Sequence, residues 1–238
     1  MRFMKMIDLK EKPKNPTIIE GFPGFGFVST IVTEFLIKHL NAKRIGSIYS
    51  TKLKPMVAIH DSEVIDPLEV YYDKKHNIVI LRALANVNGA EWDIATILID
   101  LAKKLKAKEV IGIEGVASDS PETKTKAYYF TNLSGKKFEG MKVDNFKNGV
   151  VVGVTGVLLL KEKEIPLSCI FVEADPTLPD SRAAGEVVKV LDSYLNLKVD
   201  YKPLIKAAEE FEGKLKHLMG VADKAEKKKQ EKEIGYLG

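Results

Sequence analysis

Residues 16–40 are PTIIEGFPGFGFVSTIVTEFLIKHL. The first five of them, Pro16–Glu20, have the short apolar pattern of a strand, and the glycine-rich segment GFPGFG follows directly. From Phe27 to about Leu40 the pattern is that of a helix. A strand that leads through a glycine turn into a helix is typical of proteins in which strands and helices alternate, so this stretch predicts an α/β fold.

Strand and helix patterns alternate through most of the remaining chain. Strands are expected at residues 43–49, 56–60, 69–73, 77–83, 109–116, 127–131, 149–155 and 167–173. Helices are expected at 89–106, near 157–164, and from Asp180-Ser181 onward. A Lys-Lys-His turn between 69–73 and 77–83 predicts an antiparallel hairpin at one sheet edge. The whole pattern predicts a three-layer α/β/α domain with a mostly parallel sheet over residues 1–200.

The composition changes after this core domain. Residues 201–222 predict a C-terminal helix because nearly all of them are good helix formers. The apolar residues of this helix follow a heptad spacing, which predicts a seam buried on the core or against another protomer, at Leu204, Phe211, Leu215 and Leu218. Residues 223–238 predict a flexible charged tail, DKAEKKKQEKE, that ends in the apolar tip IGYLG. An apolar tip after a charged segment suggests a binding element.

Composition and charge exclude several classes of function. Lys and Arg total 37 against 33 Asp and Glu, and this near balance does not indicate a nucleic-acid partner. The single cysteine, Cys169, excludes an internal disulfide and a thiol cluster, and the four histidines are scattered without metal-ligand spacing. No segment has the ~20 apolar residues that span a membrane or the start of a secretory signal. We therefore expect a cytoplasmic protein without membrane, metal or cofactor.

The glycine turn has two interpretations. Gly24 and Gly26 lie between a predicted strand and a predicted helix, as in a dinucleotide-binding turn. However, Ser29 stands at the third glycine position, and no acidic residue ends a strand about twenty residues later. The pattern favours a turn whose glycines allow close packing. Anion binding by Gly24 and Gly26 at the helix N-terminus stays open.

Five carboxylates follow predicted strands. Glu20, Glu114 and Glu173 lie at strand ends, and Asp175 and Asp180 follow the last strand. Because functional groups gather at this edge of a parallel sheet, these side chains could converge as an acid/base pair or as metal ligands. They could equally cap helices and orient loops, which the pattern favours. No nucleophile–base pair is visible, so no catalytic residue is assigned.

Two stretches together resemble the archaeal members of the proteasome assembly chaperone family. They are EGFPGFGFVSTIVTEFLIKHL (Glu20–Leu40) and DPTLPDSRAAGEVVKVLDSYLNLKVDYKPLIKAAEE (Asp175–Glu210), the second with the specific signature Pro-Asp-x-Arg-Ala-Ala. The resemblance implies a nucleoside-phosphorylase-like α/β/α core, self-association and work at the proteasome α-ring. We therefore expect a non-enzymatic chaperone or activator that forms a homo-oligomer larger than a dimer.

The resemblance also gives the tip a role. Proteasome activators and chaperones commonly end in a hydrophobic residue, a tyrosine and a last residue, and this tip inserts between α-subunits. Here Tyr236 is third from the end, so the tail is HbYX-like, with Ile234, Tyr236, Leu237 and Gly238 as expected contacts. Two other classes stay open. One is a nucleotide- or nucleoside-binding enzyme that uses the glycine turn and the strand-end carboxylates, and the other is a small-molecule sensor that shares the fold.

Overall fold

The computed structural model describes residues 6–60, 62–84, 86–117, 125–134, 138, 141, 143–201 and 206. The main sheet contains β1 (Ile7–Leu9), β2 (Thr17–Gly21), β3 (Lys43–Ile48), β6 (Leu68–Asp73), β7 (Ile78–Ala83), β8 (Glu109–Ala117), β9 (Ala127–Thr131), β10 (Asp144–Asn145) and β11 (Leu167–Ala174). A separate hairpin consists of β4 (Ala58–His60) and β5 (Glu63–Ile65). The helices are α1 (Val28–His39), α2 (Glu91–Leu105), α3 (Gly153–Leu160) and α4 (Ser181–Leu195), with 3-10 turns η1 (Phe25–Phe27) and η2 (Glu162–Glu164).

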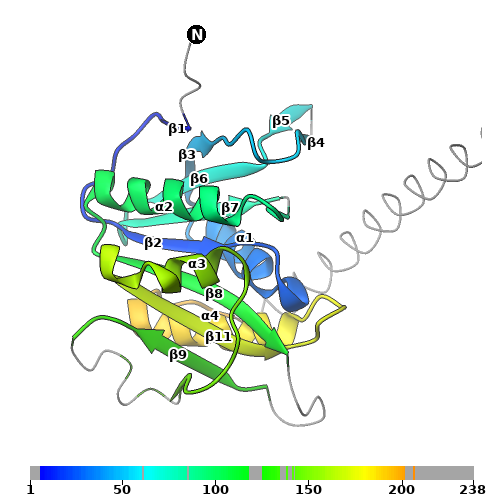
Figure 1. The fold of residues 1–238 in the computed structure, drawn as a ribbon, viewed down its shortest axis with the longest axis vertical. Helices are drawn as coiled ribbons and strands as arrows, with labels where there is room; N and C mark the ends of the chain where they lie inside the picture. The colour runs from blue at the N-terminus through cyan, green and yellow to red at the C-terminus, as the bar shows by residue number, and fades with distance from the viewer. Residues whose placement is uncertain are drawn as a thin grey trace, which may run out of the picture.

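The helices cover both faces of the sheet (Figure 1). On one face, α2 and α3 pack over a core that includes Ile18, Val110 and Phe171. On the other face, α1 and α4 pack over a core that includes Ile19, Ile111 and Ile170. Neighbouring residues of one strand enter opposite cores because side chains alternate across a strand. Both faces are therefore buried, and the three-layer α/β/α prediction is confirmed.

The helix ends follow from local chemistry. α2 carries Glu91 and Asp93 in its first turn and Lys103 and Lys104 in its last turn, which complement the helix dipole. α4 begins after Asp180, whose carboxylate accepts a hydrogen bond from the backbone N–H of Ala183 at 2.9 Å. The N-cap position predicted at Asp180-Ser181 is thus occupied by the aspartate.

The sheet has the order β1-β3-β6-β7-β2-β8-β11-β9-β10 among the described residues. Its centre is parallel, because β2 pairs with β7 and β8, and β8 pairs with β11. The flank formed by β1, β3, β6 and β7 is antiparallel, and β9 also runs antiparallel to β11. The sheet is therefore mixed, and the prediction of a mostly parallel sheet is wrong. The β6–β7 hairpin exists, but β3 and β1 lie outside it, so it is not at the sheet edge.

The segment predicted as a strand at 149–155 is also different. Residues 149–152 are irregular, and α3 begins at Gly153, which has φ +77°. The β-branched run favours a strand locally. In the fold, Val154, Val157 and Leu158 enter the core under α2 and α3, and this tertiary packing overrides the local preference.

In the part of the chain that the structure describes, none of the helices is both long enough and apolar enough to cross a membrane.

Candidate functional site

The glycine turn joins β2 to α1 and is held by backbone geometry. Gly26 has φ +62°, and a Cβ there would lie 2.9 Å from the Cβ of Ala174 and 3.0 Å from that of Asp180. Ser29 donates a hydrogen bond to the carbonyl of Phe22, which ties the first turn of α1 to the loop before it. Gly26 is therefore required for close packing, and Ser29 supports the turn in place of a third glycine.

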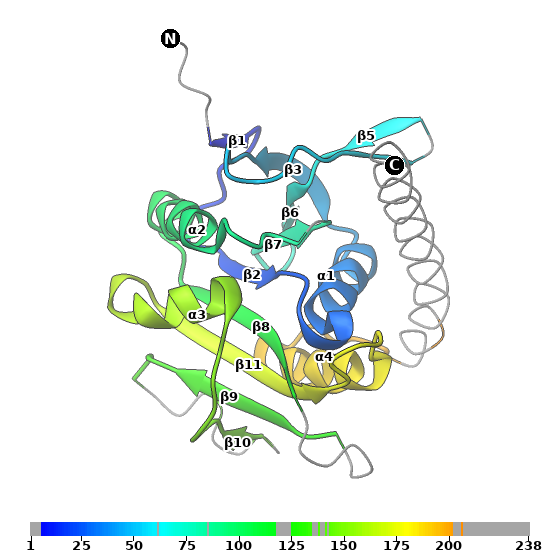
Figure 2. The same ribbon diagram turned by 45° about the vertical axis from the view of Figure 1, so that its right-hand side comes forward.

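The two stretches that carry the family resemblance meet at this turn. The backbone N–H of Asp180 donates to the carbonyl of Gly26 at 2.8 Å. The same residue caps α4, and α4 packs beside α1 (Figure 2). A segment near the start of the chain and the Pro-Asp-x-Arg-Ala-Ala segment near residue 180 thus form one structural unit.

Two of the predicted strand-end carboxylates, Glu20 and Glu114, come together. Glu20 on β2 pairs in register with Gly112 on β8, and Glu114 is two residues further along β8 on the same face. Gly112 leaves the room that they need, because a Cβ there would lie 2.8 Å from Glu20 Oε1. The hydroxyl of Thr155 on α3 lies 3.2 Å from Glu20 Oε1 and 3.1 Å from Glu114 Oε2.

The protonation of Glu20 and Glu114 follows from their burial and from their shared contact with Thr155. A hydroxyl carries one proton, so Thr155 donates to one carboxylate and can only accept from the other. Glu20 is fully buried, and burial together with the neighbouring Glu114 raises the pKa of Glu20 well above its ordinary value of 4.5. Glu20 is therefore the protonated member, and Thr155 donates to Glu114. Burial also raises the pKa of Glu114, to about 7.

The other three predicted carboxylates have separate roles. Glu173 accepts a hydrogen bond from the phenol of Tyr128 at 2.8 Å. Asp175 accepts hydrogen bonds from the backbone N–H groups of Thr177 and Leu178, which lower its pKa. Asp180 is the N-cap of α4. Orientation of loops and helices, the role that the sequence favours, thus applies to Asp175 and Asp180.

A cavity of about 770 Å³ opens at the carboxyl ends of β8 and β11. Glu114 and Glu173 line it, as do Gly24 and Phe25 of the glycine turn and the segment Asp144–Val152. Gly24 faces Glu114, because a Cβ at this glycine would clash with Glu114 Oε1. The Glu114 carboxylate beside Gly24 repels an anion, so the surroundings of the turn favour a cation over the anion whose binding the sequence left open.

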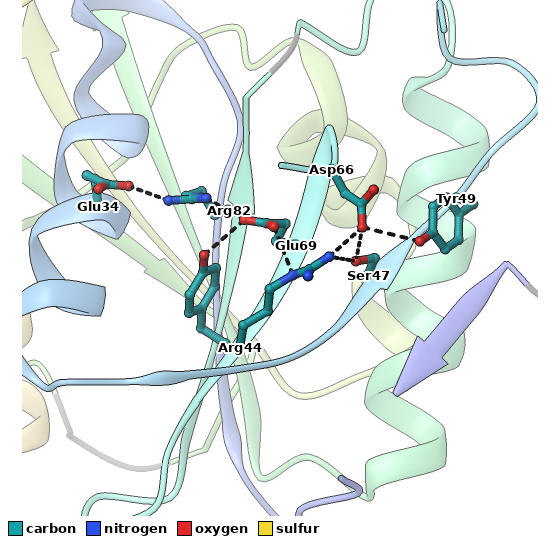
Figure 3. Close-up of polar contacts among 8 residues, drawn as sticks. Glu34, Arg44, Ser47, Tyr49, Asp66, Glu69 and Arg82 are labelled. Atoms are coloured by element: carbon teal, nitrogen blue, oxygen red, sulfur yellow. Dashed lines mark hydrogen bonds and ion pairs between the residues drawn. The ribbon is translucent and has the colours of Figure 1, made fainter. Parts of the chain in front are cut away.

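A second polar cluster joins α1 to the antiparallel flank of the sheet (Figure 3). Glu69 on β6 is 2% exposed and forms ion pairs with Arg82 on β7 and Arg44 on β3. Arg82 also pairs with Glu34 on α1 at 3.0 Å, and Arg44 pairs with Asp66 at 2.5 Å. Every charge has an opposite partner, so this cluster stabilises the fold and leaves no charge for a ligand.

Several predicted residues lie outside the described part of the chain. They are the seam residues Leu204, Phe211, Leu215 and Leu218 and the tip residues Ile234, Tyr236, Leu237 and Gly238. Cys169 is buried beside the carboxyl pair, and burial together with Glu20 and Glu114 raises its pKa. Among the described residues no group of three or more His, Cys, Asp and Glu side chains is arranged to hold a metal ion.

Sequence reasoning missed Thr155 and the cavity wall at residues 144–152. Both fall in or beside the segment predicted as a strand, where Thr155 would have been one more β-branched residue of a sheet. The sequence signal was Gly153 in the interior of the predicted strand, since glycine weakens a strand.

Comparison with known proteins places these features in context. The model of the PAC2 family matches residues 18–219, a range that contains both stretches joined at the glycine turn. An uncharacterized protein of Methanocaldococcus jannaschii is 30% identical over 223 residues, which span 90% of this chain and 90% of that protein.

Solved structures show the same fold. The crystal structure of Pyrococcus furiosus PbaA, described as an archaeal homolog of proteasome-assembly chaperone, is 29% identical with a TM-score of 0.79. The match covers 92% of this chain and 99% of PbaA. Pyrococcus furiosus PbaB, described as an archaeal proteasome activator, is 24% identical with a TM-score of 0.74 over 90% of this chain and 98% of that protein. At this identity the likeness to PbaB shows the fold.

Proposed function

The chain belongs to the PAC2 family, and we propose that it is a proteasome assembly chaperone or activator that works by binding and not by catalysis. The observation that carries this proposal is the likeness to PbaA, which extends over 92% of the chain at 29% identity. The comparisons favour this class over the nucleotide- or nucleoside-binding enzyme. The carboxylates beside Gly24 also disfavour a phosphate at the turn.

The proposed partner is the α-ring of the proteasome core particle. The segment 223–233 carries five lysines and four acids, and the tip 234–238 is apolar with Tyr236 at its centre. A charged segment that presents an aromatic residue suits insertion into a pocket between subunits, where a buried tyrosine is a strong anchor. We assign the contact to Ile234, Tyr236, Leu237 and Gly238.

Self-association is the second part of the proposal. Two exposed apolar patches occur among the described residues. The hairpin patch on and just before β4–β5 consists of Met56, Val57, Ile59 and Val64, and Ile59 pairs with Val64 across the hairpin. The groove patch consists of Trp92 on α2 with Val152 and Leu160 at the two ends of α3, around a groove of about 570 Å³. Exposed apolar patches commonly mark interfaces.

Two different patches suit a closed oligomer larger than a dimer. A ring of identical subunits uses a head-to-tail interface in which one surface of each protomer contacts a different surface of the next. The hairpin projects from the antiparallel end of the molecule (Figures 1 and 2). The groove is lined instead by residues at the start of α2, of α3 and of the segment just before α3. We therefore propose that the hairpin patch of one protomer packs on the groove patch of its neighbour.

Native mass spectrometry of the purified chain, alone and mixed with proteasome α-subunits, tests the proposal. The expected result is a single homo-oligomer larger than a dimer and a new species that contains both proteins. Bovine serum albumin at the same concentration serves as the control for non-specific adducts. A chain that stays monomeric and forms no complex with α-subunits would contradict the proposed function.

A further inference from the structure

The cavity at the carboxyl ends of β8 and β11 has the dimensions of a ligand site. Small-molecule sites commonly have volumes of about 300–1,000 Å³, and this cavity has about 770 Å³. The glycine turn, β8, β9, β11 and the segment 144–152 all contribute to its walls. The cavity is thus formed by the centre of the fold and not by one surface loop.

The part of the cavity wall that the structure describes is predominantly negative. It includes the carboxylates of Glu114, Glu173 and Asp144 and, among the described residues, one cationic side chain, Lys147. Among the described residues no cation forms an ion pair with Glu114. Within the described part of the chain, Thr155 is the one hydrogen-bond donor to this carboxylate, at Oε2. Glu114 Oε1 faces the space beside Gly24 and has no hydrogen-bond partner among the same residues.

Glu20 lies next to Glu114 and also has a carboxyl oxygen without a hydrogen-bond partner among the described residues. It is 0% exposed, and its Oε2 atom has no hydrogen-bond partner among the described residues. Thr155 links the two carboxyl groups. A buried polar group without a partner is costly and commonly marks a functional position. Glu20 is protonated and therefore neutral, so this atom marks the position while Glu114 supplies its negative charge.

The remaining walls are apolar. Phe25 and Phe146 contribute aromatic rings, and Val150, Val151 and Val152 contribute branched side chains. Phe25 and Val150 are exposed, so their surfaces are available to a ligand. A cation carried on a flat or branched apolar body would contact these walls while its charge reaches Glu114.

We propose that this cavity binds a small organic cation, an amidinium, guanidinium or ammonium group on an apolar body, with Glu114 as its counter-ion. Glu114 accepts the charged N–H groups at Oε1. Thr155 is a positioning residue, because its hydroxyl donates to Oε2 and fixes the carboxylate orientation. The absence of a side chain at Gly24 leaves the space that the charged group occupies. This ligand site shares Val152 with the groove patch, and its assigned ligand contacts include none of the tip residues 234–238.

The proposal makes binding depend on pH in a defined direction. Of the residues that the structure describes, the titratable and charged groups around Glu114 are Glu20 on β2, Tyr128 on β9, Cys169 and Glu173 on β11, Asp144 on β10 and Lys147. Burial raises the pKa of Glu114 to about 7, so below this pH the free protein holds a proton at this site. A bound cation favours the carboxylate and releases that proton. Affinity should therefore rise as the pH increases through 7.

Isothermal titration calorimetry of the full chain with benzamidine tests the site, with neutral benzamide as the matched control of the same shape. The affinity for benzamidine should rise about tenfold between about pH 6 and about pH 8. Repetition in two buffers of different ionisation enthalpy should show release of roughly one proton per ligand at about pH 6. Benzamide should bind at least about tenfold more weakly.

Three variants assign the effect to residues. Glu114→Gln should lose the affinity for benzamidine and the proton release, whereas Asp100→Asn, an exposed carboxylate on α2, should retain both. Thr155→Val removes the hydrogen bond that lowers the pKa of Glu114, so it should move the pH profile upward. A capped tripeptide with a central arginine tests whether the site takes an arginine side chain of another protein instead of a free small molecule. It should bind more weakly than benzamidine.

Four results would overturn the proposal. They are equal binding of benzamide and benzamidine, an affinity independent of pH, unchanged binding by Glu114→Gln, and no binding of benzamidine at low millimolar concentration. Tighter binding of the tripeptide would overturn the assignment to a free small molecule. Deletion of residues 234–238 should leave benzamidine binding unchanged, so failure of this site and failure of the chaperone function can be distinguished.

Discussion

Thr155 connects two carboxyl groups from different strands that differ in protonation because they differ in burial. Glu20 holds a proton because it has no access to water, whereas Glu114 faces the cavity and changes protonation near neutral pH. Such a pair costs stability when Glu114 ionises without a partner. Retention of this cost is understandable if the ionised carboxylate is needed by a ligand.

The first prediction concerns the stability of this pair. The pKa of Glu114 is about 7 in the folded protein and near 4.5 when it is exposed, so the folded state binds more protons between these values. The free energy of unfolding should therefore fall as the pH rises through this window, by as much as about 3 kcal/mol. Glu114→Gln should remove this loss and be the more stable protein at about pH 8. Urea unfolding at several pH values measures how the free energy of unfolding of each protein depends on pH.

The control for this experiment is Asp100→Asn, which removes an exposed carboxylate from α2. Its stability should follow that of the unaltered protein at each pH. If the free energy of unfolding changed with pH in the same way for the unaltered protein and for Glu114→Gln, Glu114 would not titrate near neutral pH.

The second prediction concerns the ion-pair cluster of Figure 3. Glu69→Gln removes one of the two carboxylates that pair with Arg82, whose side chain is only 13% exposed, and weakens the contact with Arg44. Loss of one partner from a buried ion pair typically costs about 3 kcal/mol. Urea unfolding should show a loss of this size, whereas Glu63→Gln on the exposed β5 should change stability by less than ~0.5 kcal/mol. Equal effects of the two substitutions would contradict this role for Glu69.

At the scale of elements, strand positions could be predicted well and sheet topology could not. The strands around Ile19, Val79, Ile111 and Ile170 are short apolar runs, and both-face burial makes such runs conspicuous in a sequence. The direction of each strand depends on which neighbour it pairs with, and β1 and β3 join the sheet through contacts distant in sequence. A short helix near 157–164 was expected, but the first residues of α3, 153–155, were assigned to a strand because the β-branched run around them favours strand conformation locally.

The same distinction applies to the candidate site. Glu20 and Glu114 could be identified from the sequence as carboxylates at strand ends, since strand ends are visible in the pattern. Their convergence on Thr155 required the crossing of α3 over β8, which no local pattern encodes. The cap of α4 was predictable because an Asp before a helix is a local signal.

The third prediction tests that cap and its contact with the glycine turn. Asp180→Ala removes the acceptor for the Ala183 N–H and should lower the free energy of unfolding by about 1 kcal/mol. Asp180→Asn keeps an acceptor and should cost only a few tenths of that amount. Thermal unfolding of both variants measures the difference. An alanine variant as stable as the asparagine variant would show that the cap contributes nothing.

At the scale of the whole molecule, the proposed function depends on several copies acting together. One apolar tip binds weakly, but tails on a common oligomer convert later contacts into intramolecular ones and can raise the avidity by about 10² to 10⁴. An oligomer whose subunits match the repeated pockets of a ring is therefore a suitable binding partner for that ring. In this proposal the core domain supplies the assembly, and the C-terminal segment supplies the contact.

The fourth prediction tests head-to-tail assembly. Ile59→Glu places a charge in the hairpin patch, and Trp92→Glu places one in the groove patch; both residues are exposed, so the fold should persist. Each variant alone should be a monomer in sedimentation velocity. A mixture should form dimers, because the intact groove of the first variant can receive the intact hairpin of the second. A mixture that stays monomeric, or variants that assemble normally, would refute this interface.

The most direct test of the central claim is biolayer interferometry on immobilised proteasome core particles. The full chain, a chain without residues 234–238 and the Tyr236→Ala variant are compared at the same oligomer concentration. The account predicts that truncation leaves the circular dichroism spectrum and oligomer size unchanged and weakens binding by about 10² or more, and that Tyr236→Ala causes most of this loss. Binding of the truncated chain as tight as that of the full chain would contradict the account and place the contact on the core domain.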